Sequence, residues 1–183
     1  KESLTGLGLI GNGSHRGYLC HNTLAVAAAS GEVLGLARQI LHCREEVPPD
    51  ESRAQRRERE SRESRLWVRS SEGIGTAPPG SLWVDVCDRG ADTFEYFAHQ
   101  HQANQYYLVR AKHNRRVGIP AGGEDQQARL HTYARRLPEM GRRSVDVPAH
   151  AGQRARVATM AVAWSAVTLL PPKNPRGEYD ETP

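Results

Sequence analysis

The chain has 183 residues, 38% hydrophobic and 25% charged, a composition typical of a soluble globular protein with a substantial core. Its longest weakly polar stretch, from about Val157 to Leu170, contains Thr and Ser and is too short to cross a bilayer. Three cysteines, an odd number, fit a reducing compartment better than a disulfide framework. No signal peptide is visible, and because the chain begins at Lys1 rather than Met we expect it to be part of a longer protein.

The net charge of +4 is unevenly distributed along the sequence. Between Arg110 and Arg156, eleven Lys and Arg residues stand against four Asp and Glu residues, an excess larger than that of the whole chain. Nearly all of these cations are Arg, which can bind a phosphate through two hydrogen bonds. The region therefore suggests binding to a polyanion, most simply nucleic acid, and a solvated Arg-rich face is the alternative.

After a Gly-rich entry, the first part of the chain predicts a two-stranded hairpin. The segments Gly17–Ala29 and Val33–Cys43 have the composition of strands, and Ser30-Gly31 supplies the turn between them. The Ala-rich end of the first segment is also compatible with a helix, which the Ser-Gly-Glu sequence after it would interrupt. We therefore favour the hairpin.

A zinc site is a second interpretation of the Cys and His residues in this hairpin. Cys20 would face His42 across the two strands, which gives two ligands on one face. His21 and Cys43 would then point to the opposite face. Four convergent ligands do not result, so small buried side chains in a sheet are the better interpretation.

The segment Glu51–Trp67, which follows a loop at Pro48-Pro49, is highly charged and has little apolar content. Opposite charges four residues apart support a solvent-exposed helix. The pairs concerned are Arg56–Glu60, Arg59–Glu63 and Glu58–Arg62. Trp67, at the end of this helix, is expected to anchor it to the sheet.

The stretch from Ser81 to Asp92 carries the strongest functional indication. Its apolar run, rich in Val and Trp, predicts a strand with little solvent contact that ends at Asp88. Gly90 permits a turn, and Asp92 with Glu95 three residues later forms a box that can cap a helix. Asp88 thus lies where a strand ends and a helix begins, the edge of an α/β sheet at which ligands gather. It is either a ligand for a hard metal such as Mg²⁺ or part of the turn.

A helix over Asp92–Ala103 and a strand over Tyr106–Ala111 are expected next, with Phe94 and Phe97 on the inward face of the helix and Tyr96 as a further candidate for it. The chain that continues this strand carries four side chains beyond the sheet edge: Arg110, Lys112, His113 and Arg115.

A Pro- and Gly-containing break over Gly118–Gly123 separates this region from a more β-rich one. Short strands are predicted at Ser144–Val147, Arg154–Ala163 and Val167–Leu170, with turns at Pro148 and Gly152. Trp164 is expected in the core.

Two motifs resemble the DDE transposases of bacterial insertion sequences. They are Asp88-Arg89-Gly90-Ala91-Asp92 and Leu108-Val109-Arg110-Ala111-Lys112-His113-Asn114-Arg115. The branch that they resemble is the cut-and-paste type, with a β-rich insertion in its ribonuclease-H-like catalytic domain. A looser similarity covers His15–Val26, which resembles the family's second strand, and Glu63–Trp67, where Leu66 replaces the usual basic residue.

The resemblance implies that Asp88 is the second of three metal-binding acids, and so a catalytic residue and a ligand of Mg²⁺ or Mn²⁺. The first Asp, and the third acid in a Tyr-x-x-Arg-x-x-x-Glu helix, would lie outside this chain, so we expect the chain alone to be inactive. Asp85 is a weaker ligand candidate, and Asp92 is assigned to helix capping. The residues implied in binding DNA at the transposon ends are Arg110, Lys112, His113 and Arg115.

The expected fold class is α/β, a ribonuclease-H-like mixed sheet with flanking helices plus a β-rich insertion subdomain, incomplete in this chain. Residues 1–117 would form part of the catalytic core and residues 118–183 the start of the insertion. The implied function is metal-dependent phosphodiester hydrolysis and strand transfer on double-stranded DNA, at transposon ends and target. The full-length protein would be a homodimer on DNA in the bacterial cytoplasm, associated with the nucleoid and not with a membrane. The alternatives are a non-catalytic DNA-binding module derived from a transposase and a ribonuclease-H-like nuclease or resolvase.

Overall fold

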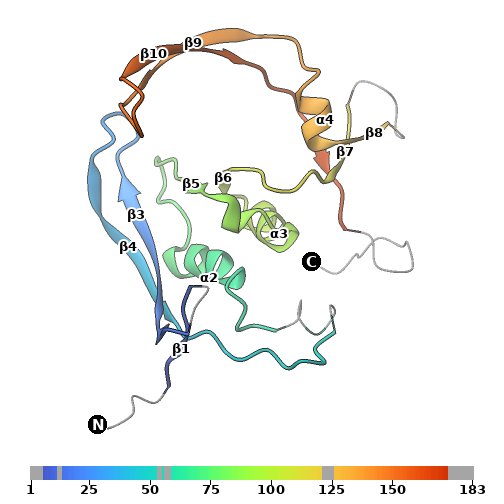
Figure 1. The fold of residues 1–183 in the computed structure, drawn as a ribbon. Coiled ribbons are helices and arrows are strands. Elements are labelled where there is room, and N and C mark those ends of the chain that lie inside the picture. The colour runs from blue at the N-terminus through green and yellow to red at the C-terminus, as the bar shows by residue number, and fades with distance from the viewer. Residues whose placement is uncertain (1–5, 12–13, 53–54, 56–58, 121–125, 173–183) are drawn as a thin grey trace. The chain divides into compact units, whose positions relative to one another are not determined.

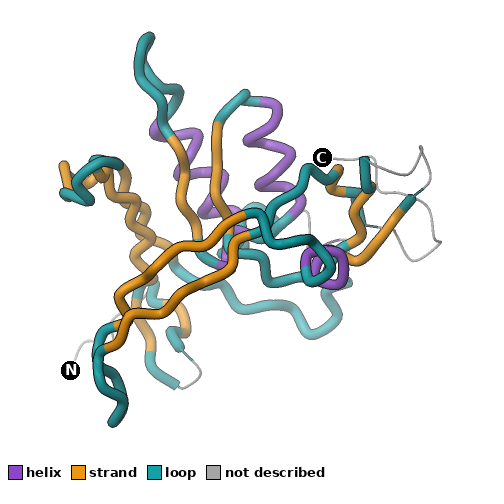
Figure 2. Tube along the Cα trace, turned by 90° about the horizontal axis from the view of Figure 1, so that it is seen from above, coloured by secondary structure: helices purple, strands orange, loops and turns teal. Residues whose placement is uncertain are grey.

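Two structural units follow one another in the chain, a first unit of Lys1–Ala111 and a second unit of Lys112–Thr182 (Figure 1). The structure is a computed structural model, and it describes residues 6–11, 14–52, 55, 59–120 and 126–172. Strands and loops make up most of this described chain, with short helices between them (Figure 2). Each unit is considered by itself below.

The hairpin predicted near the start of the first unit is confirmed. Strand β3 (Leu19–Val26) pairs antiparallel with β4 (Val33–His42), and Gly31 in the turn has a φ of +74°. Glycine adopts this left-handed conformation without the steric cost that a Cβ brings. A smaller antiparallel pair, β1 (Gly8–Leu9) and β2 (Arg16–Gly17), precedes the hairpin.

The strand register excludes the facing arrangement that a zinc site in this hairpin would use. Cys20 pairs with Leu41, and His42 pairs with Leu19, so the expected pairing of Cys20 with His42 is wrong by one residue. The shift places Cys20 on the exposed side, whereas His42 is buried with 5% of its surface exposed. A shift of one residue moves a side chain to the other face of a strand.

The helix expected over Glu51–Trp67 is wrong in its bounds. Helix α2 spans Arg65–Ile74, with Leu66 and Val68 buried. Within the expected range Gln55 is helical, whereas residues 59–64 are turns and irregular chain, and Arg59 pairs with Glu51 at 3.1 Å instead of with Glu63. The pairs Arg56–Glu60 and Glu58–Arg62 involve residues outside the described part of the chain. Apolar burial, and not the exposed charge pairs, therefore decides where this helix lies.

The strand–turn–helix–strand order predicted around Asp88 is confirmed. Strand β5 (Val84–Cys87) is followed by a 3₁₀ turn (Arg89–Ala91), helix α3 (Phe94–Gln102) and strand β6 (Tyr106–Val109). β5 and β6 pair in parallel, with Cys87 opposite Val109. This βαβ arrangement brings the carboxyl ends of both strands to one edge.

The first residue of α3 is capped by a different side chain from the one expected. Thr93 is the N-cap, and its Oγ1 accepts a hydrogen bond from the Tyr96 N–H at 3.3 Å. Asp92 lies one residue too early for this role and is buried, with 2% of its surface exposed. The capping role assigned to Asp92 is therefore wrong. Both residue types are good caps, and the 3₁₀ turn before the helix shifts the start by one residue.

One face of the β5–β6 pair packs on α2 and α3, and the other face is open. Along both strands half-buried residues alternate with exposed ones. Val86 is 74% exposed and Leu108 is 63% exposed, so the expectation of a strand with little solvent contact is wrong for this face. Parallel strands ordinarily bury both faces, which makes this open apolar face unusual.

The second unit is built mainly from strands, as expected, although its first elements were not foreseen. Strand β7 (Arg116–Gly118) pairs with β8 (Gln127–Arg129) and with β11 (Thr168–Leu169), and helix α4 spans Leu130–Ala134. Val117 of β7 is fully buried. The boundary that the sequence predicted between the catalytic core and the insertion, after residue 117, lies inside β7.

The longest elements of the second unit are β9 (Gly141–Val147) and β10 (Arg156–Val162), which form an antiparallel hairpin. They correspond to two of the strands expected here. Trp164, which follows β10, is 63% exposed, so its expected place in the core is wrong. Most residues of this hairpin are exposed on both faces, so it offers little buried surface for the indole.

The described residues therefore form a mixed α/β fold with small separate sheets and short helices. The sequence expectation of an α/β class is confirmed at this level. In the described part of the chain, no helix is both long and apolar enough to cross a membrane.

Candidate functional site

Asp88 lies directly after the last residue of β5, at the carboxyl edge of the parallel pair. Its backbone is extended, and its Oδ1 accepts a hydrogen bond from the Gly90 N–H at 2.7 Å, which caps the 3₁₀ turn. The residue is exposed, and its Oδ2 accepts no hydrogen bond from the described residues. The turn thus fixes one oxygen of the carboxylate and leaves the other open to solvent.

Trp67 and Gly90 form the wall beside this carboxylate. A methyl group on Gly90 would lie 3.0 Å from Asp88 Oδ1 and 3.0 Å from Trp67 Nε1, so the indole and the carboxylate meet around a residue without a side chain. Trp67 also contacts His21 of β3 edge-to-face, with 4.7 Å between ring centroids. The expectation that Trp67 anchors its helix to the strands is confirmed.

Arg110 lies next to Asp88 at the same edge. Its backbone N–H donates to the Cys87 carbonyl at 3.2 Å, which continues the β5–β6 ladder by one step. Asp88 and Arg110 are therefore neighbours across the two strand ends, and both are exposed. No ion pair joins either of them to another described residue. The edge thus carries an exposed acid and an exposed Arg at neighbouring backbone positions.

The other three predicted DNA-binding residues belong to the second unit. Lys112 and His113 are exposed, whereas Arg115 is half-buried and its carbonyl accepts a hydrogen bond from the Leu130 N–H at 2.9 Å. Asn114 fixes this segment further, because its Oδ1 accepts from the His131 N–H at 2.8 Å. The structure therefore divides the four predicted DNA-binding residues between the two units.

The side chains around Asp88 supply one carboxylate for a divalent metal ion. Asp85, three residues earlier in β5, points to the helix-covered face, and Asp92 is buried. Across the described residues, no three His, Cys, Asp or Glu side chains converge as a metal-binding group. Mg²⁺ accepts one or two carboxylates and keeps several waters, so Asp88 fits as one ligand of such an ion.

Asp85, a weaker ligand candidate from the sequence, belongs to a hydrogen-bonded cluster of side chains that the sequence did not predict. Its Oδ2 accepts hydrogen bonds from Ser71 at 2.7 Å, from Gln100 Nε2 at 2.7 Å and from the Tyr96 hydroxyl at 3.1 Å. The alternation of Val84, Asp85 and Val86 indicated that this acid faces away from the valines, but the sequence did not indicate its partners.

Two ionisable groups beside Asp85 are held in their protonated forms. Burial raises the pKa of Tyr96 far above its ordinary value, and a hydrogen bond to the Cys87 thiol acts in the same direction. Burial also raises the pKa of the Cys87 thiol, with the Asp85 and Asp88 carboxylates adding to the increase. A protonated thiol is a poor nucleophile, so Cys87 is a structural residue.

The stability of the first unit is expected to depend on pH through His21. Burial lowers the pKa of His21 below its ordinary 6.5, although the Asp88 carboxylate opposes part of this effect. Below pH 6.5 the unfolded chain binds the proton more readily than the folded chain. The free energy of unfolding should therefore fall as the pH drops from 6.5 to the lowered pKa, and level off below it. Above pH 6.5 His21 should contribute no slope.

Urea unfolding at a series of pH values between about 7.5 and 5 measures this slope. The variant His21→Phe keeps the ring contact with Trp67 but cannot titrate, so it should lose this part of the slope. An unchanged slope in the variant would assign the pH dependence to other groups.

A scan of the chain against models of known protein families finds no match.

Proposed function

We propose that the chain is part of a DDE transposase with a ribonuclease-H-like catalytic domain, in which Asp88 is the second of the three metal-binding acids. The substrate class is double-stranded DNA, at the transposon ends and the target. The reaction is metal-dependent phosphodiester hydrolysis followed by strand transfer. The proposal places the first acid on a strand before His15 and the third in a helix beyond the chain, so this chain alone would not cleave DNA.

The observation that carries the proposal is the exposed Asp88 carboxylate at the carboxyl end of β5, with Arg110 beside it. Ligands of α/β folds gather at this edge. The position agrees with the motif beginning at Asp88, in which the family's second acid ends a strand. A carboxylate bound in an ion pair within the core would have argued against the proposal.

The residues at the edge have separate tasks in this reaction. Bound Mg²⁺ or Mn²⁺ would activate the attacking hydroxyl and stabilise the leaving 3′-oxygen. Asp88 holds the ion, and the hydrogen bond from Gly90 to its Oδ1 orients the carboxylate before the metal arrives. Arg110 binds a backbone phosphate, because its guanidinium can donate two parallel hydrogen bonds to phosphate oxygens. Neither task requires recognition of a base.

The second unit from residue 118 on would be the beginning of the family's β-rich insertion. Its exposed hairpin and its Arg-rich sequence suit contact with a DNA backbone. Lys112, His113 and Arg115, at its start, are assigned to the phosphates of the transposon end. The full-length protein would act as a homodimer on paired ends.

DNA binding by the chain tests the role of Arg110. We expect Arg110→Glu to weaken binding to a short duplex about tenfold or more, because it removes a charge-assisted contact and adds repulsion. Fluorescence anisotropy at several salt concentrations gives both the affinity and the salt dependence. The slope of log K against log salt should become shallower by about one, as for the loss of one phosphate contact.

Arg69→Glu is the matched control, because Arg69 is exposed on α2 in the same unit and the charge change is the same. It should leave binding nearly unchanged. Equal losses in the two variants would mean that only net charge matters, which would contradict a site at the β5–β6 edge.

A further inference from the structure

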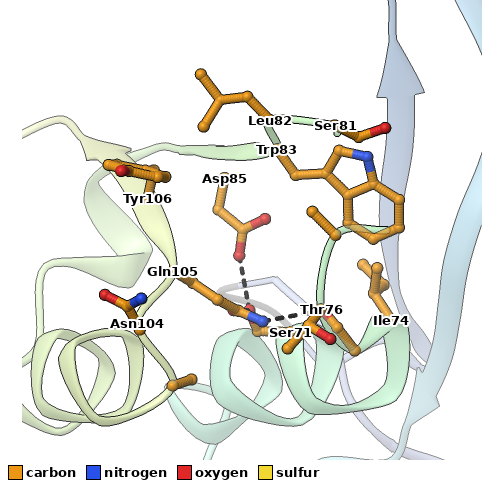
Figure 3. Close-up of a pocket in the computed structure, with 13 residues that line it drawn as sticks. Ser71, Ile74, Thr76, Ser81, Leu82, Trp83, Asp85, Asn104, Gln105 and Tyr106 are labelled. Atoms are coloured by element: carbon orange, nitrogen blue, oxygen red, sulfur yellow. Dashed lines mark hydrogen bonds between the residues drawn. The ribbon is translucent and has the colours of Figure 1, made fainter. Parts of the chain in front are cut away.

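A second site in the first unit lies at the opposite end of the β5–β6 pair from Asp88. It is a cavity of about 310 Å³ between the end of α2, the segment that leads into β5 and the start of β6 (Figure 3). A volume of this size is at the small end of ligand-binding pockets. Its polar wall contains Ser71, Asp85 and Gln105, and its apolar wall contains Leu82, Trp83 and Tyr106.

The Ser71 hydroxyl in the polar wall faces more hydrogen-bond acceptors than it has protons to donate, and one of them belongs to Gln100, which does not line the cavity. The Ser71 hydroxyl faces three oxygens: Asp85 Oδ2 at 2.7 Å, Gln105 Oε1 at 3.1 Å and Gln100 Oε1 at 3.3 Å. A hydroxyl has one proton, and the nearest and most basic of the three acceptors is the carboxylate. The two amide oxygens therefore face the hydroxyl without a proton from it.

The side-chain amides of Gln100 and Gln105 are both held with their oxygens toward Ser71 and cannot rotate to turn an N–H toward it without losing other hydrogen bonds. Gln105 Nε2 donates to the Gly75 carbonyl at 2.9 Å, which holds its Oε1 toward Ser71. Gln100 Nε2 donates to Asp85 Oδ2 at 2.7 Å and to the Tyr96 hydroxyl at 2.6 Å, which holds that amide as well. The orientation of both side chains is thus set by bonds that a flip would break.

Asp85 adds a negative charge with one oxygen still available. All its hydrogen bonds from the described residues fall on Oδ2, and none falls on Oδ1. Figure 3 shows one carboxylate oxygen bonded to Ser71 and the other directed to the side on which the Trp83 indole lies. The cavity therefore joins a carboxylate oxygen that accepts no hydrogen bond from the described residues to an aromatic wall, with Trp83 45% exposed.

We propose that this cavity binds a primary alkylammonium group, with its N–H donors on Asp85 Oδ1 and Gln105 Oε1 and its alkyl stem along Leu82 and Trp83. An ammonium carries three N–H donors and no acceptor, so it can donate to oxygens that receive no proton from Ser71. Its positive charge is opposite to that of the Asp85 carboxylate. The face of an indole also attracts cations. The proposal is independent of the transposase assignment, because it uses neither Asp88 nor DNA.

Titration of the ¹⁵N-labelled 183-residue chain with n-butylammonium chloride, followed by NMR, tests the proposal. The Trp83 indole N–H signal, assigned with the variant Trp83→Phe, should shift and saturate at about millimolar ligand. Neutral n-butanol and potassium chloride should leave this signal nearly unchanged at the same concentrations. An equal response to butanol would indicate a purely apolar pocket, and a response to potassium alone would indicate a metal-ion site. Either result, or no saturable shift, overturns the proposal.

Substitutions test which groups hold the ligand. Asp85→Asn keeps the shape but removes the charge and should weaken binding at least about tenfold. Trp83→Leu keeps an apolar wall but removes the ring and should weaken binding about two- to fivefold, measured on the side-chain NH₂ signal of Gln105 because the indole signal is absent. Trp164→Leu, which changes an exposed indole of the second unit, should have no effect. If Asp85→Asn fails to fold by circular dichroism, the Trp83→Leu and butanol comparisons still decide.

A primary ammonium could come from a free amine or from a lysine side chain of another protein. N-acetyl-lysine N-methylamide, which presents the same ammonium on a peptide unit, distinguishes these sources. Tighter binding of this compound than of n-butylammonium would identify a protein partner. Weaker binding would identify a small free amine.

Discussion

Replacement of Tyr96 by Ala is expected to lower the free energy of unfolding of the first unit by about 3–5 kcal/mol. Tyr96 is 1% exposed and packs against Phe97 and Tyr107, with ring centroids 6.2 Å and 6.1 Å away. Its removal would leave a cavity where α3 meets β6. It would also take away the hydroxyl that joins Asp85, Cys87 and Gln100.

Urea unfolding followed by near-ultraviolet circular dichroism measures this loss. Tyr96→Phe keeps the ring and removes only the hydroxyl, so it should cost about 1–2 kcal/mol and separate packing from hydrogen bonding. Tyr106→Ala, at a residue that is 65% exposed on the open face of β6, is the control and should cost less than about 1 kcal/mol. Similar losses for Tyr96→Ala and Tyr106→Ala would contradict the described core.

Replacement of Asp85 by Ala is expected to destabilise the same unit by about 2–4 kcal/mol. Ser71, Tyr96 and Gln100 all donate to its Oδ2, and Ser71 and Gln100 are 3% and 0% exposed. Without the carboxylate these donors lose their shared acceptor at positions that water reaches poorly. The short bond between Gln100 and Tyr96 would remain, so the loss is smaller than three separate unpaired donors would give.

Thermal and urea unfolding of Asp85→Ala beside Asp146→Ala measure this effect. Asp146 is an exposed acid of β9 with the same charge, and its loss should change the free energy of unfolding by no more than about 0.5 kcal/mol. In a double-mutant cycle, Tyr96→Phe and Asp85→Ala should be less than additive, because both remove the bond between the two side chains. Additive losses would mean that this bond contributes nothing to stability.

Local sequence signals predicted the elements whose boundaries depend on local chemistry. The Ser30-Gly31 turn marks the hairpin because a glycine is needed at a left-handed position, and the apolar run before Asp88, rich in Val and Trp, predicted a strand. The end of this strand at Asp88 was predicted because the apolar run stops at that acid and Gly90 then permits a turn. These features also located Asp88 and Arg110 at one edge of a parallel pair.

The misplaced features depend on contacts between segments far apart in sequence. Charge pairs predicted a helix through Glu63, but Glu63 pairs with Arg44 of a distant segment, and the helix starts where Leu66 can be buried. Trp164 was expected in the core because of its size, yet the hairpin before it offers no buried surface. The hydrogen-bond acceptors around Ser71 of α2 are Asp85 in β5, Gln100 in α3 and Gln105 just before β6. No local sequence pattern predicts these contacts between separate elements.

In the proposed enzyme, the open oxygen of Asp88 holds a divalent metal ion at the β5–β6 edge. Mn²⁺ is paramagnetic and broadens the NMR signals of nearby amides, so a titration of the ¹⁵N-labelled chain in the presence of duplex DNA locates the ion. We predict selective broadening of the Arg89 and Gly90 amide signals, and its loss in Asp88→Asn. Broadening that is absent at this turn, or that persists unchanged in Asp88→Asn, would contradict the assignment. DNA binding without metal at Asp88 would instead favour a non-catalytic DNA-binding module.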